Sequence, residues 1–181
     1  DAKNENVGIF EKTSINYFVD FADALTDPED GKILTGIMCR EIMMAMSSFA
    51  DEPTHFDRVA ISKAGNSSMG IMVALELQKP WVFVDVRGGV ISSEAIEGQL
   101  FPNEEVIIVH DVLASGKLIE VMAHEISKRG AKVKNVFVLM ERIDRQPKPS
   151  EVLSKCGLNL YCITQISDAA LARKISKSKT R

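Results

Sequence analysis

Hydrophobic and polar residues follow one another in blocks of two kinds along most of this chain. Short apolar runs rich in β-branched residues predict strands, and longer stretches with apolar residues three and four positions apart predict helices. The expected strands are Arg58–Ser62, Trp81–Val86, Glu105–His110, Lys134–Met140 and Leu158–Ile163. The expected helices between them are Ser67–Gln78, Gly116–Arg129 and Ser150–Lys155. Such an alternation predicts right-handed crossovers and a parallel sheet flanked by helices, which is an α/β fold.

Local signals support the ends of these elements. Ser67 or Ser68 can cap the first of the three helices, and Gly130 can end the second in a left-handed conformation. The run Glu105–His110 is almost continuously apolar, as expected of a strand that is covered on both faces. Trp81 opens its strand and is expected to pack there.

A different pattern precedes residue 55. Lys32–Phe49 reads as one long helix rich in methionine, and its Met38–Met46 stretch suits a core or a subunit interface better than a ligand site. Asn16–Phe21 fits either a strand or a turn. We therefore expect one domain over residues 1–181, with an N-terminal helical hood at 1–50, an α/β core at 55–165 and a basic tail at 174–181.

The composition and net charge of the chain argue against some classes of binding partner. The 181 residues are 45% hydrophobic and 26% charged, with a net charge of −3, so neither nucleic acid nor a membrane is expected as a partner. No apolar run reaches the ~18 residues of a membrane span. Three cysteines without metal-binding spacing favour a reducing, cytoplasmic setting. The basic tail Lys174–Arg181 reads as a solvated end or as a segment that touches phosphate or RNA.

The segment Val106–Lys117 is the first candidate for chemistry. An apolar strand ends at the polar pair His110–Asp111, and Ser115 and Gly116 then open a helix. Free backbone amides and the helix dipole make such a turn an anion site, to which Lys117 adds charge. Asp111 suits the hydroxyls of a sugar, or a Mg²⁺ ion held between it and a diphosphate. The same spacing is also found in ordinary βα turns.

A second strand-to-helix loop, Ser62–Gly70, is rich in small hydrogen-bond donors. A second anionic group such as pyrophosphate can bind its amides, with Lys63 nearby. Helix capping by serine accounts for the composition equally well.

Taken together, these segments resemble the type I phosphoribosyltransferases, and the orotate phosphoribosyltransferases in particular. Val106–Lys117 is similar to the family's motif for phosphoribosyl pyrophosphate (PRPP), and Ile96–Gly98 before Glu105–His110 is similar to the IEG approach of the orotate group. Lys12–Pro28 and Leu153–Ile163 resemble that group's N-terminal segment and closing strand. The likeness covers roughly residues 10–170.

The resemblance implies a reaction in which ribose 5-phosphate passes from PRPP, bound with Mg²⁺, to a nitrogenous base such as orotate, as in pyrimidine biosynthesis. It implies Asp111 and Arg87 as catalytic residues, with Mg²⁺ held indirectly through PRPP beside Asp111. A loop at Arg87–Ala95 closes over the substrate. The implied PRPP contacts are His110, Asp111, Leu113, Ala114, Ser115, Gly116, Lys117 and Leu118. The pyrophosphate loop is Ser62, Lys63, Ala64, Gly65 and Asn66, and Tyr17 and Phe18 are candidates for the base, although core packing suits them too.

Departures from the family pattern keep a second function open. His110 stands where the family has an acid, Ala114 and Leu118 replace polar phosphate ligands, and Arg87 is the sole cation in Val82–Gln99. The candidate functions are therefore a phosphoribosyltransferase and a PRPP- or nucleotide-binding regulatory protein without turnover; an unrelated nucleotide-binding fold is a third. Related enzymes are dimers, so the apolar Met38–Met46 face leads us to expect a homodimer.

Charged residues elsewhere are expected at the surface. His55 and His124 are expected to be solvated. The cluster that contains Glu141 and Arg142 reads either as a solvated group or as part of a base pocket.

Overall fold

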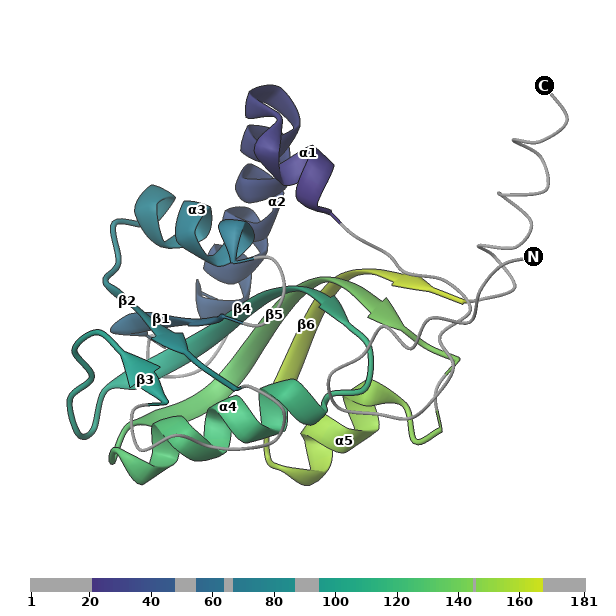
Figure 1. Ribbon diagram of the computed structural model, residues 1–181. Coiled ribbons are helices and arrows are strands. Elements are labelled where there is room, and N and C mark those ends of the chain that lie inside the picture. The colour runs from purple at the N-terminus through teal and green to yellow at the C-terminus, as the bar shows by residue number, and fades with distance from the viewer. Residues whose placement is uncertain (1–20, 48–54, 64–66, 87–94, 145, 168–181) are drawn as a thin grey trace, which may run out of the picture.

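The strands in the described part of the chain form one six-stranded sheet, and helices cover both of its faces (Figure 1). The computed structural model describes residues 21–47, 55–63, 67–86, 95–144 and 146–167. The strands are β1 (Arg58–Ser62), β2 (Trp81–Val84), β3 (Ile96–Glu97), β4 (Glu105–Leu113), β5 (Lys132–Arg142) and β6 (Asn159–Ile166). The helices are α1 (Ala22–Thr26), α2 (Pro28–Ser47), α3 (Ser68–Glu76), α4 (Lys117–Lys128) and α5 (Pro149–Lys155).

The sheet has the order β3-β2-β1-β4-β5-β6, and the expected parallel pairing is confirmed for five of its strands. The exception is β3, which pairs antiparallel with β2 through Phe83 and Glu97. Only residues 85–95 separate these two strands, which is short for the helical crossover that a parallel pair requires. The sheet is therefore mixed, with its one reversed strand at the edge.

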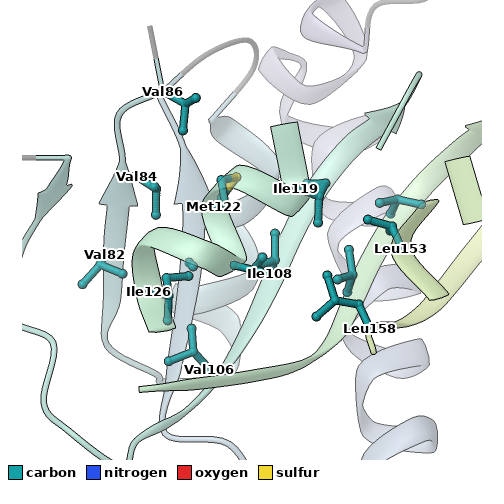
Figure 2. Packing of buried hydrophobic residues seen from close by; sticks show 14 of the residues in the cluster. Val82, Val84, Val86, Val106, Ile108, Ile119, Met122, Ile126, Leu153 and Leu158 are labelled. Atoms are coloured by element: carbon teal, nitrogen blue, oxygen red, sulfur yellow. The ribbon is translucent and has the colours of Figure 1, made fainter. Parts of the chain in front are cut away.

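Two apolar layers hold the helices on the sheet. Figure 2 shows the layer under α4 and α5, where Ile108 and Val84 of the sheet meet Ile119 and Met122 of α4. On the opposite face, Ile107 and Phe137 pack with residues of α2 and α3 such as Met38 and Met69. Neighbouring β4 residues thus serve opposite faces, which explains why that strand is continuously apolar.

β4 is longer than the sequence pattern predicted. We expected it to end at His110, but it continues to Leu113, where Val112 pairs with Met140 and Leu113 pairs with Glu141 of β5. The polar pair His110–Asp111 suggested a strand end because polar side chains are uncommon in a covered strand. Here the pairing with β5 outweighs that local signal, so Asp111 lies within the strand.

The expectation of a solvated cluster after the strand predicted at Lys134–Met140 is wrong for Glu141 and Arg142, which belong to β5 and are both buried. Glu141 accepts hydrogen bonds from the Ser150 amide and from the Gln165 side chain, each 2.9 Å long. Buried carboxylates need such partners, so Glu141 ties α5 and β6 to the end of β5. His124 is exposed, as expected. Among the described residues, no helix is both long and apolar enough to cross a membrane.

Candidate functional site

The strand order places the two predicted anion-binding turns on neighbouring strands. β1 and β4 lie side by side, yet the chain leaves β1 toward β2 and leaves β4 toward β5. Their following helices cover opposite faces, α3 with α2 on one and α4 with α5 on the other. This is a topological switch point, the position at which open α/β sheets bind ligands beyond the carboxyl ends of their strands.

The pairing between the two strands ends before the strands do. The last paired residues are Ala60 and Ile108, although β1 continues to Ser62 and β4 to Leu113. The residues that follow Ala60 and Ile108 therefore lie at the switch point and make no β1–β4 ladder hydrogen bonds with one another.

The turn after β4 presents a short row of backbone amides. Gly116 precedes α4 with φ of 82°, and its carbonyl accepts the first helical hydrogen bond from Glu120. The Lys117 amide lies 3.3 Å from the Ser115 hydroxyl oxygen, a long contact. Within the part of the chain that the structure describes, the amides of Ser115, Gly116 and Leu118 donate to no protein acceptor. A helix N-terminus with free amides favours an anion.

Gly116 fixes the shape of this turn. A positive φ strains any residue with a side chain, and a Cβ at Gly116 would lie 3.2 Å from the Pro149 carbonyl oxygen and 3.3 Å from Cβ of Val152. The close approach of α5 therefore adds to the conformational requirement for glycine. Leu113 is one of the predicted phosphate contacts. It belongs to β4 and its side chain is buried in the core, so only its backbone could contact a phosphate.

Asp111 and His110 form an adjacent pair near the end of β4. Asp111 is 6% exposed, and its Oδ1 accepts a hydrogen bond of 2.7 Å from the Val112 amide. The Nδ1 atom of His110 lies 2.7 Å from the same oxygen, but the contact lacks the geometry of a hydrogen bond. Both ring nitrogens of His110 are buried without a regular hydrogen bond to a described residue, and the Asp111 carboxylate is the charged group next to Nδ1.

Asp111 is held in its charged form. Burial on its own would raise the pKa of Asp111, but the His110 ring and the Val112 amide outweigh burial, so the pKa lies below its ordinary value. Because Oδ1 is engaged by the Val112 amide, Oδ2 is the oxygen with capacity for a further donor. A charged carboxylate oxygen of this kind accepts strong hydrogen bonds from hydroxyl groups.

The second turn begins at the end of β1. The Lys63 amide donates to the Val84 carbonyl, which extends the β1–β2 ladder by one residue. Ser67 does not cap α3, contrary to one expectation: its hydroxyl donates instead to the Ser62 carbonyl at 2.8 Å. This bond joins the two ends of the segment 63–66.

The Lys63 ammonium is in direct contact with Oε1 of Glu97 on β3. Lys117, the cation of the other turn, pairs with Glu120 at 2.9 Å. The sequence patterns did not identify either carboxylate partner. Glu97 lies in the IEG segment, but its pairing with Lys63 depends on the antiparallel addition of β3 to the sheet, for which single-chain periodicity gives no signal.

Some predicted residues lie outside the described part of the chain. These are Tyr17, Phe18, Ala64, Gly65, Asn66 and Arg87, together with most of the expected closing loop. The described residues that the fold brings to the switch point are His110, Asp111, the turn 114–118, Ser62 and Lys63.

Known proteins are similar to this chain in sequence and in fold. No family model matches the chain. The orotate phosphoribosyltransferase of Pyrococcus abyssi is 26% identical over 163 residues, which are 90% of this chain and 84% of that protein. A Mycobacterium tuberculosis orotate phosphoribosyltransferase solved with PRPP has a TM-score of 0.62 at 16% identity, covering 86% of this chain and 85% of its own.

A further solved structure widens the comparison beyond orotate. The adenine phosphoribosyltransferase of Thermoanaerobacter pseudethanolicus has a TM-score of 0.66 at 20% identity, covering 88% of this chain and 94% of its own. The sequence relatives, the shared fold and the position of the strand–Asp–turn segment at the switch point agree. This chain is therefore similar in sequence to the orotate phosphoribosyltransferases and has the type I phosphoribosyltransferase fold.

Proposed function

We propose that this protein transfers ribose 5-phosphate from PRPP to a nitrogenous base, with orotate as the first candidate, and releases pyrophosphate in the cytoplasm. One observation carries the proposal: the turn before α4, with its free backbone amides, and the end of β1, with Lys63, lie on neighbouring strands at one switch point, with a charged Asp111 beside them. PRPP has two phosphate-bearing ends joined by a ribose, and that arrangement matches two anion sites on either side of a carboxylate.

In this proposal each turn binds one end of PRPP. The free amides at Ser115, Gly116 and Leu118 bind the 5′-phosphate at the start of α4. Oδ2 of Asp111 accepts hydrogen bonds from the ribose hydroxyls. Ser62 ends the neighbouring strand β1, and Lys63 follows it, so both are assigned to the pyrophosphate end. The other predicted contacts of this loop lie outside the described residues.

These contacts would lower the barrier by orientation and charge. The base attacks the anomeric carbon as the bond to pyrophosphate breaks, and positive charge develops on the ribose. A negatively charged Asp111 beside the sugar stabilises that charge, while cations such as Lys63 and Arg87 stabilise the leaving pyrophosphate. Closure of the segment Arg87–Ala95 would exclude water.

The chemistry of the donors suits a Mg²⁺ ion that arrives with its diphosphate. Among the described residues, no three carboxylate, imidazole or thiol groups converge as a metal site. Mg²⁺ prefers phosphate oxygens and water with few protein ligands, so Asp111 would act on it through PRPP. When bound, the ion supplies charge neutralisation of the diphosphate.

A regulatory protein that binds PRPP or a nucleotide without turnover is the alternative function. His110 replaces an acid of the family motif, and its buried ring adds no negative charge beside the sugar. The solved adenine phosphoribosyltransferase also keeps the identity of the base open.

An assay that separates these functions uses the whole chain with Mg²⁺, PRPP and a panel of bases that includes orotate and adenine. Pyrophosphate release is measured beside PRPP binding by calorimetry. Release with one base supports the enzyme and names its substrate. Binding without release supports the regulatory protein, and the absence of both rejects the site.

We also propose that the protein is a homodimer, through the exposed side of α2. Within the expected Met38–Met46 stretch, Met38 is fully buried against the sheet, whereas Met43 and Met44 are exposed. Together with Ile33 and Ile37, Met43 and Met44 are the exposed large apolar residues of α2. Their spacing places them along one side of the helix, and an exposed apolar stripe of this kind is typical of an interface.

Replacing both Ile33 and Met44 with Lys should convert a dimer into a monomer, because charged side chains at a buried interface lose hydration without gaining a partner. Both positions are more than half exposed, so the subunit itself should stay folded. Light scattering at micromolar concentration gives the mass. Leu75→Lys, which changes an equally exposed apolar residue on α3, is the matched control. A monomeric wild type would contradict the proposal.

A further inference from the structure

The ion pair between Lys63 and Glu97 connects the end of β1 with β3. In the proposed reaction, both lie next to segments that contact the pyrophosphate group. Lys63 is the residue that follows β1, at the start of the proposed pyrophosphate turn. Glu97 lies on β3, shortly after the segment Arg87–Ala95 that is proposed to close. The Lys63 side chain is 26% exposed and that of Glu97 is 56% exposed, so an incoming ligand can reach the pair.

The backbone fixes both partners. The Lys63 amide donates to the Val84 carbonyl, and Glu97 pairs with Phe83 in the antiparallel β2–β3 ladder. Gly98 follows with φ of 106°, close to the backbone of Val82, and Ile96 packs on the apolar layer of the sheet. The contact is therefore set by the sheet itself, whereas the side chain of Lys63 stays free to turn toward a stronger anion.

The local charge balance is unfavourable for a diphosphate. The Lys63 ammonium contacts the Glu97 carboxylate, and the two charges of this pair cancel. A diphosphate that approaches Lys63 has to compete with the Glu97 carboxylate and is repelled by it over a few ångströms.

We infer that Glu97 is a positioning residue that sets the affinity of the β1 turn for the pyrophosphate group by competing for the Lys63 ammonium. The inference rests on the proposed function in taking the ligand to be the pyrophosphate end of PRPP. Glu97 holds the ammonium at the edge of the turn in the ligand-free protein and gives it up to a more highly charged anion. It thereby weakens binding of pyrophosphate, which a transferase has to release as product.

Titration calorimetry with inorganic pyrophosphate and Mg²⁺ tests this on four proteins: wild type, Glu97→Gln, Lys63→Met and the double variant. Glu97→Gln should tighten pyrophosphate binding by about two- to fivefold, the range of an exposed ion pair. Lys63→Met should weaken it, and Glu97→Gln should then have little effect in the Lys63→Met background. Such coupling separates competition for Lys63 from a general change in net charge.

Glu76→Gln, an exposed carboxylate at the far end of α3, is the control for net charge and should leave the affinity unchanged. Unchanged or weaker binding by Glu97→Gln would overturn the inference, as would an equal gain with and without Lys63, or no pyrophosphate binding by any of the proteins. Turnover with PRPP is measured separately. If the protein turns over PRPP but Glu97→Gln does not tighten pyrophosphate binding, this inference alone is rejected. If Glu97→Gln tightens pyrophosphate binding but the protein neither binds nor turns over PRPP, the proposed function alone is rejected.

Discussion

Replacing Asp111 with Asn is expected to weaken PRPP binding by about tenfold to a hundredfold, the range for one lost hydrogen bond to a charged group. Asn retains an oxygen that can accept the Val112 amide, so the local backbone should persist. What it loses is the negative charge that we assign to the ribose hydroxyls. The effect on turnover should be at least as large, because the same charge faces the positive sugar in the transition state.

Calorimetry with PRPP and Mg²⁺ measures this change. His124→Ala, on the exposed side of α4, is the control and should bind PRPP as the wild type does. Equal affinities in the wild type and both variants would remove Asp111 from the site. A thermal melt of each variant separates lost binding from lost folding.

The pH dependence of stability gives the Asp111 substitution a second signature. The pKa of Asp111 is lower in the folded protein than its ordinary value, so its charge stabilises the folded state above the ordinary carboxyl pKa of about 4. That contribution is lost as the pH falls through the lowered pKa. Asp111→Asn should therefore be less stable than the wild type at neutral pH, and the difference should shrink in acid.

Replacing Gly116 with Ala is expected to destabilise the protein by about 2 kcal/mol or more and to weaken binding of the 5′-phosphate. A left-handed conformation costs a residue with a Cβ roughly 1–2 kcal/mol. Contacts of 3.2 Å with Pro149 and 3.3 Å with Val152 add to that cost. Relief of the strain requires α5 or the turn to move, and either movement displaces the amides that precede α4.

Gly157→Ala is a matched control for Gly116→Ala. Gly157 has a similar φ of 73°, but a Cβ there would meet no atom within 4 Å. It should therefore show the conformational cost alone and leave PRPP binding unchanged. Chemical denaturation gives the two free energies of unfolding, and equal losses would show that packing of the turn against α5 contributes nothing.

The sequence by itself determined most of the secondary structure and the location of the candidate chemistry. Strands such as β1 and β5 follow from apolar runs whose side chains have to be buried on both faces, and α4 follows from its apolar stripe and from Gly130, which has φ of 81°. These features depend on neighbours within a few residues, so a single chain records them. The segment around Asp111 and Gly116 was recognisable for the same reason.

Other features depend on partners that are distant in the chain. The extension of β4 past His110 depends on β5, and the burial of Glu141 depends on α5 and β6. The Lys63–Glu97 pair depends on β3 joining the sheet in reverse, and the exposed side of α2 depends on which of its apolar residues the sheet covers. Hydrophobic periodicity indicates that a side chain is to be buried, but it does not name the residues that will cover it. The tertiary packing determines those partners, and therefore also which charges meet and which apolar residues stay exposed.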